Sequence, residues 1–184
     1  MKKLKIITIL GTRPEIIRLS KVINLLDNRI NHILVHTGQN YDFELNEIFF
    51  KDLKINKPKY KLSLGKNKKP VENIAKILTE TEKILSKENP DAVIVLGDTN
   101  SCLSAYSAKR RKIPIFHIEA GNRCYDERVP EEINRKIIDH ISDINVTYSE
   151  VAKENLIREN LPPDRTFKID SHLYKVFQLN KKKI

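Results

Sequence analysis

Short apolar runs alternate along the chain with longer stretches in which apolar residues recur at helical spacing. The runs predict buried strands at residues 5–10, 32–37, 92–96 and 115–118, and shorter strands near 60–64, 144–146 and 166–169. The amphipathic stretches predict helices at residues 14–26, 43–50, 71–88, 102–111, 131–140 and 149–160. Because strands and helices alternate throughout, the pattern predicts an α/β fold: a doubly wound, mainly parallel, Rossmann-like sheet with helices on both faces.

Ligands of doubly wound sheets bind beyond the carboxyl ends of the strands. Four segments of the chain fall at that position in the predicted fold, namely residues 11–18, 37–40, 97–101 and 117–123. These segments are therefore the candidates for a functional site.

The segment after the first predicted strand combines one glycine with two arginines. Gly11 lets the backbone come close to a ligand, and the N-terminus of the following helix favours an anion. Arg13 and Arg18 add positive charge of the kind that suits phosphate oxygens. A single glycine is not the glycine-rich dinucleotide fingerprint. An ordinary strand-to-helix turn with a solvated arginine explains the same residues, and spacing alone slightly favours that alternative.

Three acidic residues lie at strand ends or helix starts, and each has a structural alternative. Asp98 follows a buried strand and is also a good helix-capping residue. Glu119 follows another strand, where burial would raise the pKa of its carboxyl and suit proton transfer. A structural ion pair between Glu119 and Arg123 is equally compatible with the sequence. Glu131 begins a predicted helix, where an acid commonly complements the helix dipole.

The composition indicates a soluble globular domain. The chain has 184 residues, of which 40% are hydrophobic, and no apolar run approaches the roughly 20 residues that span a bilayer. The basic and apolar start resembles a signal peptide, but no small-residue cleavage site follows it, so we interpret it as the first strand and expect a cytoplasmic protein. Cys102 and Cys124 form no metal-binding spacing and no disulfide framework.

The formal net charge of +10 raises nucleic-acid binding as one hypothesis. The lysines, however, are spread along the chain, and the clusters at residues 66–69 and 181–183 are not interleaved with aromatic residues. We therefore expect no specific nucleic-acid partner, and at most weak binding that falls with salt.

Five short segments together point to a family. Residues 11–15 (GTRPE), 37–39 (TGQ), 97–99 (GDT), 119–121 (EAG) and 130–135 (PEEINR) occur in the order of the non-hydrolysing UDP-N-acetylglucosamine 2-epimerase family. The chain resembles the N-terminal half of that family over nearly its whole length. Residues 38–42, 98–102 and 121–124 resemble the branch that makes UDP-N-acetyl-L-fucosamine for capsule or O-antigen.

The resemblance implies a fold, a reaction and a set of residues. The fold is one half of a glycosyltransferase-B-like pair of Rossmann-like domains. The reaction eliminates UDP across C1 and C2 of a UDP-2-acetamido sugar and adds UDP back with inversion at C2, with no cofactor or metal. The family's acidic residues match Asp98, Glu119 and Glu131, which we expect to be catalytic and to converge on one cleft. Substrate-binding residues are then expected at Arg13, Arg18, Gln39, Arg123 and Arg135.

The chain also departs from the family. Members are about twice as long, and a second Rossmann-like domain supplies most of the nucleotide contacts and a further histidine. We assign residues 1–169 to the first domain and residues 170–184 to an aberrant tail at the crossover to the second. We therefore expect a truncated epimerase that is inactive alone, with a UDP-sugar as its ligand. Its protein partner would be a second copy or a separately encoded C-terminal half, and the surface that faces the second domain should be exposed and promote self-association.

Overall fold

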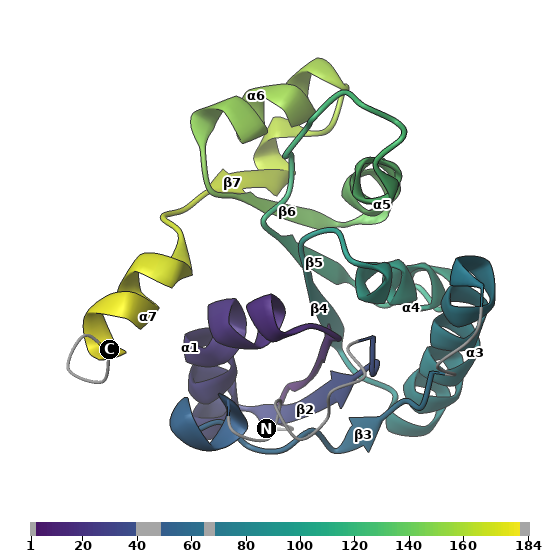
Figure 1. The fold of residues 1–184 in the computed structure, drawn as a ribbon, viewed down its shortest axis with the longest axis vertical. Coiled ribbons are helices and arrows are strands. Elements are labelled where there is room, and N and C mark those ends of the chain that lie inside the picture. The colour runs from purple at the N-terminus through teal and green to yellow at the C-terminus, as the bar shows by residue number, and fades with distance from the viewer. Residues whose placement is uncertain (1–2, 40–48, 65–68, 181–184) are drawn as a thin grey trace.

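The computed structural model describes residues 3–39, 49–64 and 69–180 of the chain. Within these residues seven parallel strands form one sheet in the order β3-β2-β1-β4-β5-β6-β7 (Figure 1). The strands are β1 (Lys5–Leu10), β2 (Asn31–His36), β3 (Tyr60–Lys61), β4 (Ala92–Leu96), β5 (Ile115–Ile118), β6 (Ile144–Thr147) and β7 (Thr166–Lys168). The strand order reverses at β1 and β4, so the doubly wound, Rossmann-like fold class is confirmed.

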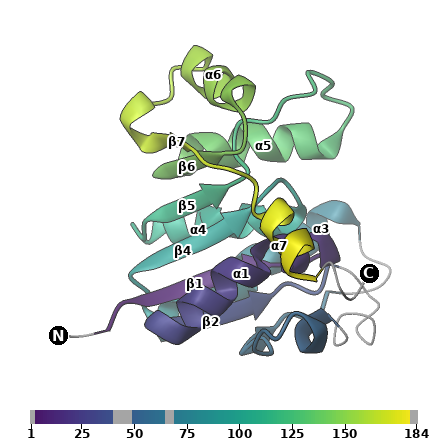
Figure 2. The same ribbon diagram turned by 90° about the vertical axis from the view of Figure 1, so that its left-hand side faces the viewer.

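The helices follow the strands as a right-handed α/β fold requires. They are α1 (Arg13–Arg29), α3 (Pro70–Glu88), α4 (Ala105–Arg110), α5 (Pro130–Ile141), α6 (Glu150–Arg158) and α7 (His172–Asn180), with short 3₁₀ helices η1 (Asn100–Ser104) and η2 (Pro163–Arg165). Helix α1 lies on one face of the sheet, and α3 and α4 lie on the other (Figure 2).

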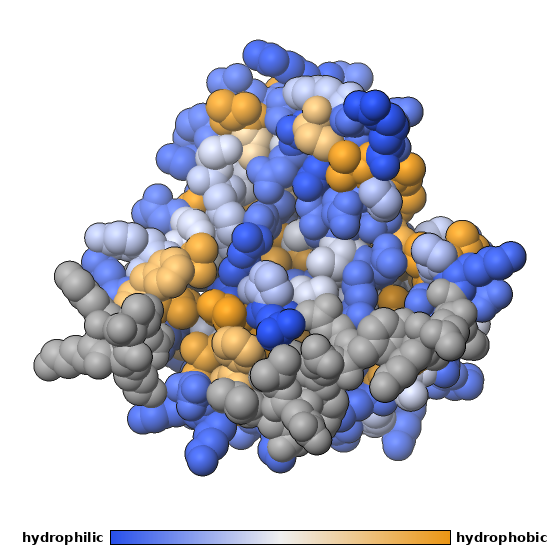
Figure 3. All heavy atoms as spheres, viewed as in Figure 1, coloured by the Kyte–Doolittle hydropathy of each residue, from blue (hydrophilic) through white to orange (hydrophobic). Residues whose placement is uncertain are grey.

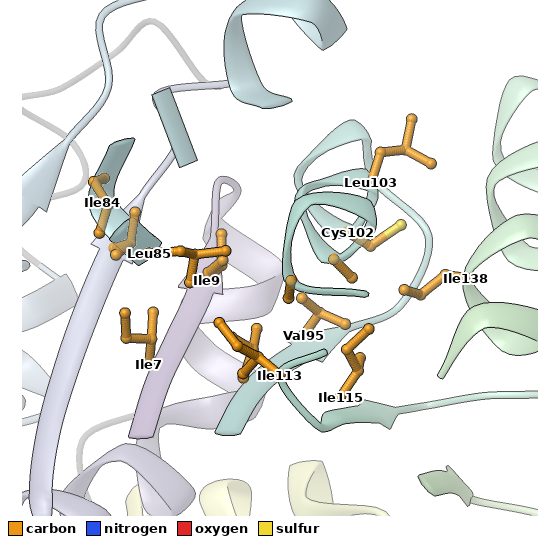
Figure 4. Close-up of a cluster of buried hydrophobic side chains, with 14 of the residues drawn as sticks. Ile7, Ile9, Ile84, Leu85, Val95, Cys102, Leu103, Ile113, Ile115 and Ile138 are labelled. Carbon is orange, nitrogen blue, oxygen red and sulfur yellow. The ribbon is translucent and has the colours of Figure 1, made fainter. Parts of the chain in front are cut away.

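Alternating side chains of the central strands build two cores. On the face of α3, α4 and α5, Ile7, Ile9 and Val95 pack with Ile115 and Ile138 (Figure 4). On the other face, Leu10, Leu96 and Ile118 of β1, β4 and β5 pack with Ile16 and Leu19 of α1. The two cores fix the register of β1, β4 and β5, and thereby the edge at which these strands end.

The structure differs from the sequence prediction in three places, and one further prediction lies mostly outside the described residues. The predicted strand at 60–64 is limited to β3, and the predicted helix at 102–111 is divided into η1 and α4. Most of the predicted helix at 43–50 lies outside the described residues, although residues 49–52 are helical. Helix α7 was not predicted; it turns back from the β7 edge and packs against α1 (Figures 1 and 2). Its Val176 is buried, so tertiary packing accounts for its stability.

Candidate functional site

The candidate residues follow strands whose carboxyl ends meet at one edge of the sheet. β1, β4 and β5 are paired in parallel, and the backbone N–H of Gly97 donates to the carbonyl of Ile118 at 2.9 Å. Asp98 and Glu119 each come directly after one residue of that pair. The two carboxylates therefore start from neighbouring strand ends. Hydrophilic side chains occupy the middle of this face, between α1 and α5 (Figure 3).

The turn between β1 and α1 binds an acid of its own chain. The backbone N–H groups of Gly11 and Thr12 donate to Glu15 Oε2 at 2.8 and 2.7 Å, and the Thr12 hydroxyl donates to the same oxygen. Burial raises the pKa of Glu15. These two backbone N–H groups, which the sequence suggested as donors to a ligand anion, therefore already bind the Glu15 carboxylate. Binding of an external anion at this turn falls mainly to arginine side chains.

Gly11 is required by close packing at the strand end. A Cβ on Gly11 would lie 2.1 Å from both the Ser101 and the Thr37 hydroxyl oxygens. These hydroxyls are 2.7 Å apart, and that of Ser101 donates to Gln39 Oε1 at 3.1 Å. The hydrogen bond to Ser101 and the packing beside Gly11 therefore hold Gln39 near the ends of β1 and β4. The side chain of Gln39 is positioned by this contact at the edge where the acids lie.

Asp98 is connected to helix α5. Its Oδ2 accepts a hydrogen bond from Arg135 Nε at 2.7 Å, and its carbonyl accepts one from Asn134 Nδ2 at 2.8 Å. The capping role that the sequence allowed for Asp98 belongs to Thr99, whose hydroxyl accepts from the N–H of Ser101. Asp98 therefore does not cap the helix, and its carboxylate forms an ion pair with Arg135.

Glu119 is held in an uncommon backbone conformation. Its φ is +68°, a left-handed value that costs a non-glycine residue free energy and that recurs at functional sites. Arg18 Nη1 on α1 donates to Glu119 Oε1 at 2.6 Å and lies 2.5 Å from Oε2. Burial, and then the negative charge of Glu119, raise the pKa of Tyr148 beside this pair. The ion-pair partner of Glu119 is thus Arg18, and the Arg123 alternative is wrong.

Glu131 and Arg13 are the remaining candidates from the sequence. Glu131 lies in the first turn of α5, and Arg13 is the first residue of α1. Glu131 precedes Arg135 by four residues, so the two side chains share one face of the helix. Across the described part of the chain, neither Glu131 nor Arg13 has a hydrogen-bond or ion-pair partner. Both side chains are available to a ligand.

Arg123 is not brought into this group. Its guanidinium is fully buried, with Nη1 2.7 Å from Asp139 Oδ2 and Nη2 2.6 Å from Glu159 Oε2. Asp139 also lies 2.8 Å from His117 Nδ1, and His117 Nε2 lies 2.8 Å from the carbonyl of Gly97. We therefore assign Arg123 a structural role in place of the substrate-binding role expected from the sequence.

Three acids in and around the site were missed by sequence reasoning: Glu15, Glu132 and Asp139. Glu132 is fully buried, and it accepts hydrogen bonds from the N–H of Cys124 at 3.0 Å and from Arg135 Nη1 at 2.9 Å. Burial alone would raise the pKa of Glu132, but these donors hold it at about 2. The spacing of three residues from Glu132 to Arg135 is the one sequence signal for this pair.

The described residues give no sign of a metal site or a membrane span. Among residues 3–39, 49–64 and 69–180, no three His, Cys, Asp or Glu side chains are arranged to hold a metal ion. None of the described helices is both long and apolar enough to cross a lipid bilayer.

A family profile described as UDP-N-acetylglucosamine 2-epimerase matches residues 25–184. The chain belongs to this family. The UDP-N-acetylglucosamine 2-epimerase of Methanocaldococcus jannaschii is 45% identical over 166 residues, which are 89% of this chain and 45% of that protein. Among solved structures, the UDP-N-acetylglucosamine 2-epimerase from Rickettsia bellii is 56% identical to this chain, with a TM-score of 0.92. The alignment covers 98% of this chain and 48% of that protein chain.

A second solved structure, the M. jannaschii epimerase in complex with UDP-GlcNAc and UDP, has a TM-score of 0.93 at 41% identity. The alignment covers 98% of this chain and 50% of that chain. The chain spans about half the length of the curated relatives it matches. The epimerase family and the fold expected from the sequence are thus confirmed for this half.

Proposed function

We propose that this chain supplies the acid–base and diphosphate-binding half of a UDP-sugar 2-epimerase. The observation that carries the proposal is Glu119, held at a left-handed φ and paired with Arg18, beside the pair formed by Asp98 and Arg135. Asp98 and Glu119 follow neighbouring strand ends, at the edge where doubly wound sheets bind ligands, and this supports a shared site for the two ion pairs.

The reaction requires both kinds of group. The C2 hydrogen of a 2-acetamido sugar is not adjacent to a carbonyl, so direct deprotonation is difficult. Elimination breaks the C2–H and C1–O bonds; a base takes the proton, UDP leaves with the electron pair, and a 2-acetamidoglycal remains. UDP then adds back to C1 while an acid delivers a proton to the opposite face of C2. Asp98, Glu119 and Glu131 are the proton-transfer groups of this proposal, and Arg13, Arg18 and Arg135 stabilise the diphosphate.

The substrate class is a UDP-2-acetamido sugar. The M. jannaschii relative was solved with UDP-GlcNAc and UDP, which supports a uridine diphosphate sugar for this chain. The segments at 38–42, 98–102 and 121–124 favour a 6-deoxy sugar, in the formation of UDP-N-acetyl-L-fucosamine for a cell-surface polysaccharide. The site requires no cofactor, because the hydrogen leaves and returns as a proton.

We further propose that this chain alone does not turn over. It corresponds to about half of its relatives, and one domain cannot enclose the nucleotide while the glycal waits for UDP. Positioning of reactants can contribute roughly 7–11 kcal/mol to lowering a barrier, so losing half of the contacts should abolish activity. A polypeptide equivalent to the second half of the relatives is therefore the expected partner.

NMR in deuterium oxide tests this proposal. The chain is incubated with UDP-GlcNAc, or with its 6-deoxy analogue, either alone or after co-expression with the second half of the R. bellii relative. We expect deuterium at C2 and a second epimer only when both halves are present. Exchange by the chain alone would show that the second half is dispensable, and no exchange by a purified complex would refute the proposed reaction.

A further inference from the structure

Glu15 is a buried acid that the proposed reaction does not use. Its exposed fraction is 2%, and an acid is rarely buried this deeply unless its charge is compensated. A capping box at the start of α1 explains one of its contacts, because the Glu15 side chain binds the backbone N–H of Thr12 three residues earlier. The capping box explains neither the burial of Glu15 nor the donor that binds its other oxygen.

The two carboxylate oxygens of Glu15 bind two different segments of the chain. Oε2 accepts hydrogen bonds from the N–H groups of Gly11 and Thr12, in the turn between β1 and α1. Oε1 accepts one from the hydroxyl of Thr99 at 2.9 Å, although Thr99 lies 84 residues further along the chain. Thr99 directly follows Asp98 in the turn after β4. One buried side chain therefore joins the start of α1 to the turn that carries Asp98.

The Thr99 hydroxyl has a single proton, and Glu15 determines where it points. Because the hydroxyl donates to Glu15 Oε1, its lone pairs are free to accept from the N–H of Ser101 at 3.3 Å. That second contact caps the 3₁₀ helix η1. Glu15 and the first turn of η1 therefore hold the residue next to Asp98 from two sides.

Asp98 itself is held by a second element, helix α5. Asn134 Nδ2 donates to the carbonyl of Asp98 at 2.8 Å, and Arg135 Nε donates to Oδ2 at 2.7 Å. We infer that Glu15 is a positioning residue, which acts through Thr99 to hold the Asp98 turn at a fixed place between α1 and α5. This inference rests on the proposed function for the role of Asp98.

The variant Glu15→Gln should break this link and keep the shape of the side chain. Its amide oxygen has to stay at the position of Oε2, because an NH₂ group there would face the N–H groups of Gly11 and Thr12. The NH₂ group then faces Thr99 in place of Oε1, so the Thr99 hydroxyl loses its acceptor and turns. A displacement of about 1 Å in a reacting group can slow a reaction by about 10²-fold.

Hydrogen exchange of the isolated chain tests the link itself. Exchange of the Ser101 amide is followed by NMR and expressed relative to Val95 in β4, which reports global opening. The ratio should rise by about tenfold or more in Glu15→Gln, because the acceptor for the Ser101 N–H is displaced. The matched control is Glu72→Gln, since Glu72 is the third residue of α3, as Glu15 is of α1, but is exposed. The control should leave the ratio within about twofold of the wild type.

The assembled pair tests the consequence for the reaction. This chain is co-expressed with the second half of the R. bellii relative, and UDP-GlcNAc turnover is followed by NMR in deuterium oxide. Glu15→Gln should lower kcat by about 10–100-fold and leave KM within about twofold, because Asp98 acts in proton transfer. The ratio of free 2-acetamidoglycal to epimer should also change, since elimination and re-addition transfer protons on opposite faces of C2. A merely structural loss would reduce both products equally.

Thr99 supplies a second pair of variants. Thr99→Ser keeps the hydroxyl and should stay within about threefold of the wild-type kcat, whereas Thr99→Val removes the hydroxyl and should resemble Glu15→Gln. The double variant Glu15→Gln/Thr99→Val should be no slower than the slower single variant, because both substitutions break the same contact.

The other outcomes overturn the inference or separate it from the proposed function. Unchanged exchange at Ser101 in Glu15→Gln, an unchanged ratio of glycal to epimer, or multiplicative losses of kcat in the double variant would each show that Glu15 does not position the Asp98 turn. A wild-type pair that exchanges no deuterium refutes the proposed reaction. The Ser101 measurement on the isolated chain then decides alone whether Glu15 holds this turn.

Discussion

Replacing Arg123 by methionine should destabilise the fold strongly, because it isolates a buried carboxylate. The side chain of Arg123 is fully buried and lies between the side chain of Asp139, which is also fully buried, and that of Glu159, which reaches solvent. Methionine keeps much of the volume and removes the charge. Glu159 can turn toward water, whereas Asp139 is left with His117 and the N–H of Gly121 as its remaining contacts.

The size of the effect follows from the cost of an uncompensated buried charge. Breaking a buried ion pair by removing one partner costs about 3–5 kcal/mol. A domain of this kind has a total free energy of unfolding of about 5–15 kcal/mol. In a chain of this length about 1 kcal/mol corresponds to 2–4 °C, so Arg123→Met should lower the melting temperature by roughly 6–20 °C. The chain should remain folded at 25 °C with a reduced margin.

The pH dependence should separate charge from packing. Burial alone would raise the pKa of Asp139, but the contacts with His117 and Arg123 lower it. The wild-type carboxylate therefore stabilises the fold above its unfolded pKa of about 3.9, and this contribution is lost as pH falls through the lowered folded value. Without Arg123 the folded pKa should rise instead. The deficit of Arg123→Met should then be largest at neutral pH and shrink in acid as Asp139 becomes protonated.

Urea unfolding followed by far-UV circular dichroism measures these differences. The matched variant is Arg123→Met/Asp139→Asn, which removes both charges. It should lose less stability at pH 7 than the sum of the two single variants, because the second substitution removes the stranded charge. A single variant Arg123→Met within about 0.5 kcal/mol of the wild type, the range of an ordinary surface substitution, would show that the network is not structural. If the losses of stability caused by Arg123→Met and Asp139→Asn simply added up in the double variant, this would also show that the network is not structural.

Two further substitutions have defined outcomes. The Lys59 ammonium, 2.7 Å from Glu88, and the Tyr60 hydroxyl lower the pKa of Glu88 to about 2. Stability should therefore fall as pH drops from about 4.5 to 2, and Glu88→Gln should flatten this part of a urea-midpoint titration; an unchanged slope would contradict the assignment. Gly11→Ala would place a methyl 2.1 Å from two hydroxyls and should cost about 1–3 kcal/mol. Adding Ser101→Ala should recover part of that loss, and no recovery would show that the clash lies elsewhere.

The sequence predicts the strands and the edge where the site lies, because those depend on local pattern. The run at 92–96 is apolar, ends at Gly97 and forms β4 within the same bounds. Parallel strands then bring Asp98 and Glu119 to one edge without further information. The arginine that pairs with Glu119 could not be chosen this way. Arg123 is four residues away and Arg18 is 101 residues away, and only tertiary packing places the distant one in contact.

The same limit applies to the two acids at the start of α5. Glu131 and Glu132 are adjacent in sequence, and both suit a helix N-terminus. A rotation of about 100° per residue directs one toward solvent and the other into the protein. Which of them is buried depends on the angle at which α5 packs against its neighbours. The sequence contains no direct signal for that angle, and the structure buries Glu132.

The most direct measurement of the central claim is C2 deuterium exchange by acid variants of the assembled pair. The chain carrying Glu119→Gln is assembled with the second half of the R. bellii relative, and exchange into UDP-GlcNAc is followed by NMR. The matched control is Glu127→Gln, whose side chain is 76% exposed and paired with Lys136 outside the site. Loss of a proton-transfer group should slow exchange by about 10²–10⁴-fold, with the control unchanged. Exchange by Glu119→Gln within twofold of the wild type would contradict the account.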